Sequence, residues 1–144
     1  MNTHMHSHDM PSPIMPSCPA QKLLRGQKAL VTGASSGIGR GIALALAEAG
    51  ADVVVNYSSG EDKARAVCNE AAKFGVRAIA VGADVSDEAQ VQRMFARMLD
   101  EFGTIDILVN NAGLQQDAPF EELTLQQWNK VYMEIGRASC RERV

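Results

Sequence analysis

The stretch TGASSGIG at residues 32–39 decides the fold. An apolar run that is typical of a strand ends at Thr32, and residues at helical spacing follow from Ile38, so the glycines lie where a strand turns into a helix. Glycine allows positive φ and has no Cβ atom, which lets the backbone approach a phosphate closely. The free N–H groups of the following helix would then face the anion. The stretch therefore predicts a phosphate-binding turn.

The spacing of the glycines separates this turn from other nucleotide loops. Three residues lie between Gly33 and Gly37 and one lies between Gly37 and Gly39, a T-G-x-x-x-G-x-G pattern rather than G-x-G-x-x-G. No Gly-Lys-Ser/Thr follows, so the lysine and magnesium ligand of a P-loop are missing. A tight turn without a ligand is the alternative reading. Ser35 and Ser36, together with the strand before and the helix after, favour the phosphate.

The rest of the chain repeats the same unit. Apolar runs alternate with segments at helical spacing, which predicts an α/β fold with a parallel sheet. We expect strands at residues 29–32, 52–56, 77–81 and 106–109, and helices at about 38–49, 61–74 and 87–102. Gly50, Gly75 and Gly103 each follow a helix at a place that favours a left-handed cap.

Two helices show a clear apolar side. The third carries one continuous stripe, interpreted as core, that consists of Val91, Met94, Phe95, Met98, Leu99 and Phe102. A fourth helix is predicted to start at Thr124, with Gln127 completing a capping box. Its expected buried side comprises Leu125, Trp128, Val131 and Tyr132.

Composition narrows the class of protein. The chain has 144 residues, of which 46% are hydrophobic, and this length fits a single domain. Its net charge of −3 argues against a nucleic-acid or membrane-surface partner. Cys18, Cys68 and Cys140 are scattered and odd in number, as expected for reduced thiols. The absence of a long apolar run or a signal-like start leads us to expect a cytoplasmic location.

The N-terminal segment, residues 1–24, is expected to be a flexible extension because its prolines would interrupt regular structure. His4, His6 and His8 alternate within it and could be drawn as a metal clamp. Ordering such a segment costs conformational entropy, so a solvated tail is the preferred interpretation and no metal site is predicted.

Three further motifs carry a family resemblance: GADV at residues 82–85, DILV at 106–109 and NNAG at 110–113. With the glycine turn, they make the chain resemble the short-chain dehydrogenase/reductase family from about Gln27 to Met133. The resemblance implies a truncated NAD(P)-binding domain over residues 25–133. Its fold would be a Rossmann-type, doubly wound parallel sheet in three α/β/α layers, with strand order 3-2-1-4.

The resemblance also implies how the cofactor is held. Asp84 would bond the adenine amino group, and Val85 would line the adenine ring. Residues 111–113 would support the sheet and pass beside the adenosine ribose. Taken alone, Asp84 could instead begin a turn, and Asn110 and Asn111 could satisfy loose backbone groups. The expected cofactor-binding residues are Gly33, Ser35, Ser36, Gly37, Ile38, Gly39, Asn56, Tyr57, Ser58, Asp84, Val85, Asn111, Ala112 and Gly113.

The end of the second strand indicates which nicotinamide cofactor is bound. NAD-specific enzymes place an acid there that grips the ribose 2′-hydroxyl and repels a 2′-phosphate. Residues 56–59 read NYSS, with no carboxylate, and Ser58 or Ser59 could donate to the phosphate. We therefore predict NADP, with NAD tolerated.

The catalytic residues of the family are not expected in this chain. The family uses a serine and a tyrosine with a lysine four residues further on, but neither Tyr57 nor Tyr132 has that lysine. Residues 134–144 read EIGRASCRERV, which departs from the family and looks like a translated sequencing adapter. We expect a fragment that ends at about Met133 and is followed by a non-native tail, with a natural short tail as the alternative.

Two classes of function remain open. The first is an oxidoreductase fragment whose parent, expected to be a homo-oligomer, transfers hydride between NADP and a carbonyl or alcohol. Residues 113–120, GLQQDAPF, look most like the glucose 1-dehydrogenase group, with 3-oxoacyl-carrier-protein reductases next. The second is a dinucleotide-sensing module without turnover.

Overall fold

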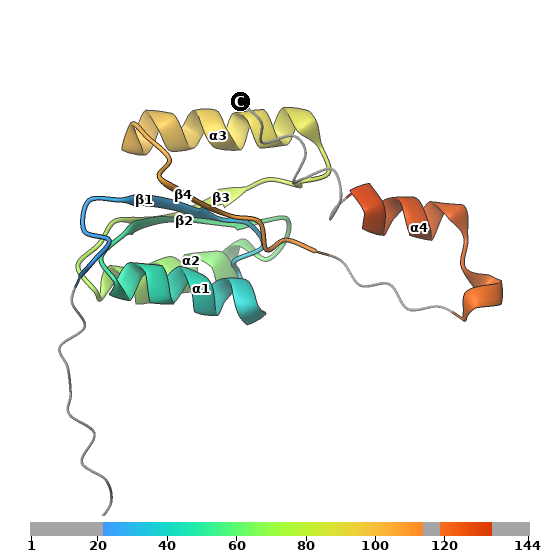
Figure 1. The fold of residues 1–144 in the computed structure, drawn as a ribbon, viewed down its shortest axis with the longest axis horizontal. Helices are drawn as coiled ribbons and strands as arrows, with labels where there is room; N and C mark the ends of the chain where they lie inside the picture. The colour runs from blue at the N-terminus through green and yellow to red at the C-terminus, as the bar shows by residue number, and fades with distance from the viewer. Residues whose placement is uncertain (1–21, 114–118, 134–144) are drawn as a thin grey trace, which may run out of the picture.

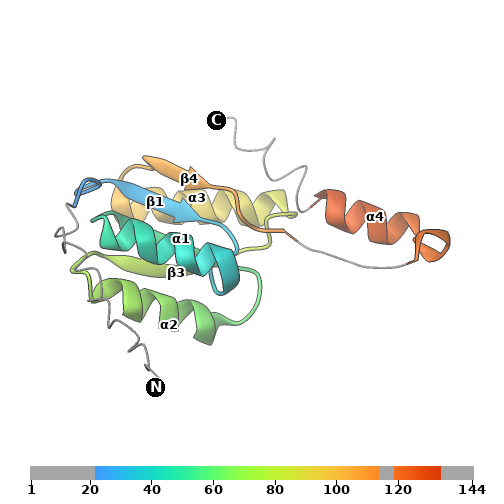
Figure 2. The ribbon, with the colours of Figure 1, turned by 60° about the horizontal axis from the view of Figure 1, so that its bottom comes forward.

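A computed structural model of the chain describes residues 22–113 and 119–133. Its elements are β1 (Lys28–Val31), α1 (Gly37–Glu48), β2 (Asp52–Tyr57), α2 (Glu61–Ala72), β3 (Ala78–Gly82), α3 (Glu88–Phe102), β4 (Ile107–Val109), a 3-10 helix (Phe120–Glu122) and α4 (Leu125–Tyr132). The strands form a parallel sheet in the order β3-β2-β1-β4. Helices α1 and α2 cover one face and α3 covers the other (Figures 1 and 2). The predicted fold class and strand order are confirmed.

The predicted helices and strands are all present, with ends that differ by at most two residues. Gly50, Gly75 and Gly103 have φ of 100°, 78° and 78°, so the three expected left-handed stops are confirmed. The fold also begins earlier than predicted. Lys22 donates to the Phe74 carbonyl at 2.6 Å, although the sequence placed it in the extension.

Side chains of the strands alternate between two cores. Val53 and Val55 face the layer of α1 and α2, whereas Val54 faces α3. On α1, the residues buried against the sheet are small, with Ala43 and Ala47 fully buried. Small side chains let a helix approach a sheet closely, which brings the first turn of α1 against the end of β1.

The stripe on α3 is largely confirmed. Val91, Met94 and Met98 are buried, and the two phenylalanines of the stripe pack partly buried against the same core. Leu99 is the exception, because 49% of it is exposed. It lies about 80° around the helix axis from Val91, at the margin of the buried face.

The predicted burial of α4 is wrong. Its capping box forms as expected, since Gln127 N–H donates to Thr124 Oγ1 at 3.2 Å and Thr124 N–H donates to Gln127 Oε1 at 2.8 Å. However, Leu125, Trp128 and Tyr132 are 74%, 59% and 57% exposed. Both ribbon views place α4 away from the sheet and its helices (Figures 1 and 2). The apolar pattern predicted the helix but did not say which element would cover it.

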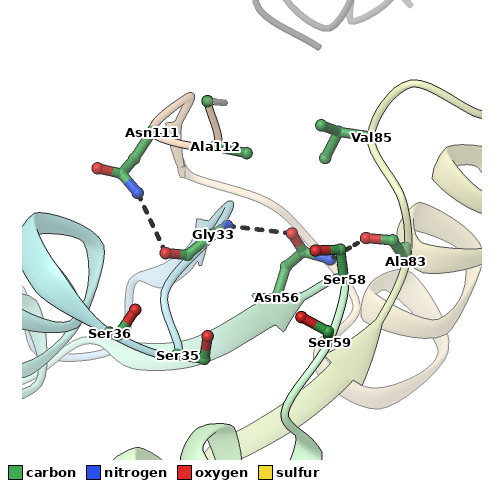
Figure 3. Close-up of a pocket in the computed structure, with 11 residues that line it drawn as sticks. Gly33, Ser35, Ser36, Asn56, Ser58, Ser59, Ala83, Val85, Asn111 and Ala112 are labelled. Carbon is green, nitrogen blue, oxygen red and sulfur yellow. Dashed lines mark hydrogen bonds between the residues drawn. The ribbon is translucent and has the colours of Figure 1, made fainter. Parts of the chain in front are cut away.

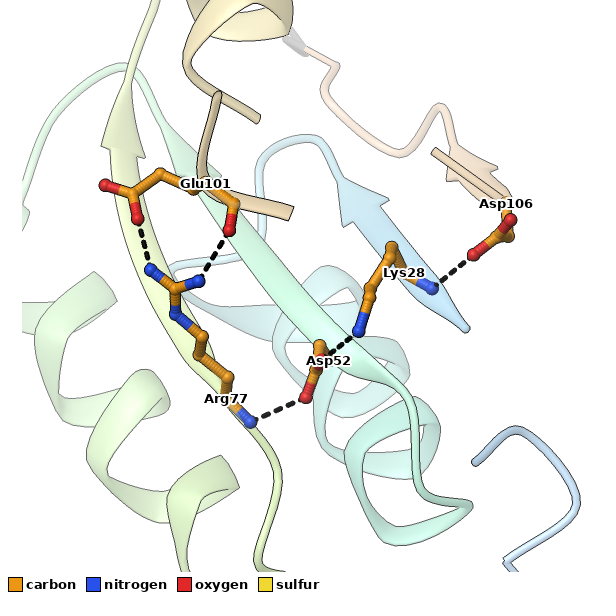
Figure 4. Close-up of polar contacts among 5 residues, drawn as sticks. All are labelled: Lys28, Asp52, Arg77, Glu101 and Asp106. Carbon is orange, nitrogen blue, oxygen red and sulfur yellow. Dashed lines mark hydrogen bonds and ion pairs between the residues drawn. The ribbon is translucent and has the colours of Figure 1, made fainter. Parts of the chain in front are cut away.

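Carboxylates hold together the strands at their amino ends, opposite the predicted site (Figure 4). Asp106 Oδ2 accepts Lys28 N–H at 2.8 Å, and Asp52 Oδ1 accepts Arg77 N–H at 2.7 Å. Asp52 also pairs with the Lys28 ammonium, and Glu101 pairs with the Arg77 guanidinium. In this way a carboxylate satisfies the N–H group at or just before the start of a neighbouring strand, which helps to fix the strand register.

Several sequence predictions fall outside the described residues: the three histidines of the extension, Cys18, Cys140 and the tail at 134–144. Cys68 is a free thiol, and burial raises its pKa to about 11, so it stays protonated at neutral pH. Within the ranges that the structure describes, no helix combines the length and apolar character needed to cross a bilayer.

The cluster at the amino ends generates a pH prediction. Burial raises the pKa of Asp52, but the Lys28 ammonium and the Arg77 N–H outweigh it and bring the pKa below its ordinary value of 3.8. A carboxyl with a lowered folded-state pKa stabilises the fold above that ordinary value, and this stabilisation is lost as the pH falls below it.

We expect Asp52→Asn to lower the free energy of unfolding by about 1 to 2 kcal/mol at neutral pH, and by much less at about pH 3. Urea denaturation at the two pH values measures this difference. Asp100→Asn, on the exposed side of α3, serves as the control and should change little. An Asp52→Asn defect of equal size at both pH values would contradict the assignment.

Candidate functional site

A cleft opens where the carboxyl ends of the strands meet at one edge of the sheet (Figure 3). The residues that line it are Gly33, Ser35, Ser36, Asn56, Ser58, Ser59, Ala83, Val85, Asn111, Ala112 and Gly113. Most of these residues carry a hydroxyl or amide group or present backbone, and none of these lining residues carries a charge. Parallel sheets bind ligands at this edge. The cleft therefore offers hydrogen bonds rather than charged side chains.

The glycine turn needs its glycines for two different reasons. Gly33 and Gly37 have φ of 62° and 56°, a conformation that L side chains rarely adopt. A Cβ atom on Gly33 would also lie 2.9 Å from Ala112 Cα, so the turn and the segment after β4 can meet only at a glycine. A Cβ atom on Gly37 would meet nothing within 4 Å, so the backbone there borders open space.

Two side-chain amides hold the turn from opposite sides (Figure 3). Asn56 Oδ1 accepts Gly33 N–H at 3.2 Å. Asn111 Nδ2 donates to the carbonyls of Thr32 and Gly33, at 2.9 and 3.2 Å. The alternative reading of Asn111, that it satisfies loose backbone groups, is what the structure shows. We call this arrangement the amide clamp.

Thr32 links the end of β1 to the segment after β4, a role that the sequence did not lead us to predict. Its side chain is buried, and its Oγ1 accepts the N–H groups of Asn111 and Ala112, both at 3.0 Å, and donates to the Val109 carbonyl at 3.3 Å. The segment after β4 is thereby fixed to the end of β1. A hydroxyl residue at the end of an otherwise apolar strand was the available signal.

The first turn of α1 begins beside the cleft, because its N-cap residue Ser36 lines the cleft wall. Ser36 is the N-cap residue, in an extended conformation (φ −159°, ψ 176°), but its hydroxyl makes no capping bond. Asp87 caps α3 and Thr124 caps α4, whereas Gly60 at the start of α2 also provides no side-chain cap. The N–H groups of residues 37–39 have no partner within the helix and lie at the positive end of its dipole. Such a terminus is a ready anion site, and here it borders an open cleft lined with hydroxyl groups.

The structure brings nine of the fourteen predicted residues to the cleft wall: Gly33, Ser35, Ser36, Asn56, Ser58, Val85, Asn111, Ala112 and Gly113. Gly37, Ile38 and Gly39 form the first turn of α1 beside it. Ser59, already named with Ser58 as a donor to the 2′-phosphate, and Ala83 of the GADV motif also line the cleft, although neither was among the fourteen.

Tyr57 does not line the cleft. Its ring packs over Gly82, where a Cβ atom would lie 3.2 Å from the phenol carbon Cζ. It faces a second hollow that Glu61 and Arg65 also line. Burial, followed by the Glu61 carboxylate, raises the pKa of the phenol. The structure gives no support to a side-chain contact between Tyr57 and a ligand in the cleft.

Asp84 organises a turn beside the cleft. Its Oδ1 accepts the N–H and the hydroxyl of Ser86 at 2.8 and 2.7 Å, and its own N–H donates to Gln90 Oε1 at 3.0 Å. The turn presents Val85 to the cleft wall. The alternative reading of Asp84 as a turn residue is therefore correct, and its adenine contact stays a prediction.

Comparison with known proteins agrees with this geometry. A family model described as short chain dehydrogenase matches residues 27–136. A hydroxynaphthalene reductase-like protein of Metarhizium robertsii is 49% identical over 109 residues, which are 76% of this chain and 41% of that protein. A 3-oxoacyl-(acyl-carrier-protein) reductase of Staphylococcus epidermidis is 46% identical over 105 residues, 73% of this chain and 43% of that protein. The chain thus spans about two fifths of the length of these curated relatives.

Solved structures give the same answer. A short chain dehydrogenase from Burkholderia cenocepacia, crystallised in complex with NADP, superposes with a TM-score of 0.80 at 40% identity and covers 83% of this chain and 49% of that one. A putative short-chain alcohol dehydrogenase from Sinorhizobium meliloti gives 0.78 at 35% identity, covering 83% and 47%. The strand order, the glycine turn and these matches lead to one conclusion: the chain belongs to the short-chain dehydrogenase family.

Proposed function

We propose that this chain holds NADP(H) in the cleft at the strand ends, and that the longer protein to which it belongs transfers hydride between NADP and a carbonyl or alcohol. The observation that carries the proposal is the uncapped first turn of α1, whose N–H groups border the cleft beside two positive-φ glycines. A diphosphate fits this place because it needs several donors and no side chain between them. The NADP-bound relative from Burkholderia supports the choice of ligand.

The uncharged lining suggests how the cleft distinguishes NADP from NAD at the ribose. Ser58 and Ser59 follow β2 and line the cleft, and no carboxylate is among the lining residues that the structure describes. An acid at this place would repel a 2′-phosphate, whereas hydroxyl groups can donate to it. We therefore expect the cleft to prefer NADP while accepting NAD, because no cation there makes the phosphate essential.

Close packing behind the turn would keep its N–H groups aimed at the cofactor. A Cβ atom on Gly39 would lie 2.5 Å from the Gly33 carbonyl oxygen and would also collide with the Asn111 amide nitrogen. Gly39 therefore lets α1 dock directly against the amide clamp. Gly41, two residues further along α1, has nothing within 4 Å of its corresponding Cβ atom.

In this proposal, the chain binds and orients the cofactor, which would accept the hydride of an alcohol or donate one to a carbonyl. The serine hydroxyls and the α1 N–H groups would hold the phosphates, while Val85 would shield one side of the adenosine. For the substrate, an alcohol and a carbonyl compete. The resemblance of residues 113–120 favours glucose, although residues 114–118 lie outside the described part of the chain. The similarity to the Staphylococcus epidermidis reductase favours a 3-oxoacyl thioester.

The ribose-end proposal predicts a cofactor preference. Fluorescence titration of the chain should give a dissociation constant for NADPH about tenfold lower than that for NADH. This ratio corresponds to the free energy of one or two hydrogen bonds to a charged phosphate. Changing both Ser58 and Ser59 to Ala should remove most of that difference and leave NADH binding almost unchanged. If the double variant weakened both nucleotides equally, the two hydroxyls would not read the phosphate.

The packing at α1 predicts opposite effects of the same change at two glycines. Gly39→Ala should destabilise the chain by about 1 to 3 kcal/mol through overpacking and weaken NADPH binding more than tenfold. The matched control Gly41→Ala should stabilise the chain by about 0.5 to 1 kcal/mol and leave binding intact. Thermal melts and nucleotide titrations measure both effects. Normal nucleotide binding by Gly39→Ala would contradict the proposed docking of the turn.

The substrate class is tested on the longer protein. We expect NADP-dependent turnover with either glucose or an acetoacetyl thioester, assayed by absorbance at the nicotinamide band. The thioester, with NADPH, is the outcome that the similar reductase favours, and glucose, with NADP, is the outcome that the resemblance of residues 113–120 favours. Tight nucleotide binding without turnover of any carbonyl or alcohol would support the non-catalytic dinucleotide sensor instead.

A further inference from the structure

We propose that Asn56 is a positioning residue that decides which N–H groups of the glycine turn are free for a ligand, and that it couples this turn to the cleft wall at the end of β3. The inference rests on the proposed dinucleotide site, but it assigns to Asn56 a role other than contact with the ribose. Only 1% of Asn56 is exposed, although its side chain is polar. It follows three valines in β2.

The Asn56 side chain is fully engaged with the protein. Its Oδ1 accepts Gly33 N–H at 3.2 Å, and its Nδ2 donates to the carbonyls of Val81 and Ala83 at 3.2 and 3.0 Å. Both N–H bonds of the amide are therefore used, and the oxygen points to the turn (Figure 3). A buried amide with these partners is costly to replace, because each lost bond leaves a buried polar group unsatisfied.

The main chain of Asn56 contributes as well. Its carbonyl oxygen accepts Ala34 N–H at 2.8 Å. The N–H groups of both Gly33 and Ala34 are thus occupied by one residue, and the first N–H that the turn can offer to a phosphate is that of Ser35. Asn56 thereby directs the ligand toward Ser35 and the first turn of α1.

The same amide joins two parts of the cleft. Through Gly33 it holds the turn next to the proposed diphosphate, and through Ala83 it holds the strand end that leads to Val85 on the opposite wall. Removal of the whole amide would therefore release both walls at once. The residue type follows from this arrangement, because aspartate lacks the two N–H donors and would bring a negative oxygen against two carbonyl oxygens. Leucine lacks the acceptor as well.

Three variants of the whole chain separate positioning from general stability. Asn56→Leu removes all side-chain bonds, and Asn56→Asp keeps only the acceptor for Gly33. The control Val53→Ala makes a cavity in the same strand, at a fully buried residue that pairs with Ala29 and Ala78 and lies away from the turn. The readouts are the NADPH dissociation constant, measured where circular dichroism shows each variant folded, and hydrogen exchange of individual amides.

We expect Asn56→Leu to bind NADPH at least about tenfold more weakly and to speed exchange of the Gly33 amide, while Val53→Ala stays within about twofold in affinity. Asn56→Asp should keep Gly33 protected but speed exchange of the Ala83 amide, which donates to the Tyr57 carbonyl at 2.9 Å. Equal NADPH affinity in Asn56→Leu and Val53→Ala would overturn the proposal.

The unmodified chain gives a second test that does not depend on a variant's folding. Without nucleotide, the Gly33 and Ala34 amides should exchange much more slowly than the Ser35 amide. Similar exchange at all three would overturn the role of Asn56 whether or not NADPH binds. Absence of NADPH binding with slow exchange at Gly33 would instead refute the proposed function and leave the positioning role of Asn56 in place.

Discussion

Both ends of the Gly33 residue are held by side-chain amides, and the cleft depends on this clamp. Asn56 Oδ1 accepts the Gly33 N–H from the β2 side, and Asn111 Nδ2 donates to the Gly33 carbonyl from the β4 side. Because β2, β1 and β4 are neighbours in the sheet, the clamp ties the turn to positions that the hydrogen-bonded sheet already fixes. A turn fixed in this way can present unpaired N–H groups of α1 to a ligand without collapsing onto them.

The two edges of the sheet are built differently, and the difference fits their tasks. At the amino ends, charged side chains such as Asp52 and Lys28 pair with each other and with the backbone. At the carboxyl ends, neutral amides and hydroxyls satisfy the turn and leave the lining uncharged. A dinucleotide brings its own negative charge, so a neutral lining with oriented backbone dipoles avoids both repulsion and competing ion pairs.

The sequence was sufficient for the fold because the strand and helix periods, the glycine stops and the turn all indicated the same α/β arrangement. It was sufficient for the position of the cleft as well, since strand ends of a parallel sheet converge. It was not sufficient for side-chain direction. Asn56 and Tyr57 are adjacent and both were assigned to the ligand, yet one is locked under the turn and the other packs over Gly82. Which of two neighbouring side chains turns inward, and whether Trp128 is buried at all, depends on tertiary packing that local periodicity does not encode.

The most direct test of the central claim is an amide NMR titration of the labelled chain with NADP. If the first turn of α1 binds the diphosphate, the amide resonances of residues 35–39 should move most, and those of Gly33 and Ala34, already bonded to Asn56, should move little. Shifts centred on the second hollow near Glu61, or no shift in residues 35–39 at saturating nucleotide, would contradict the account.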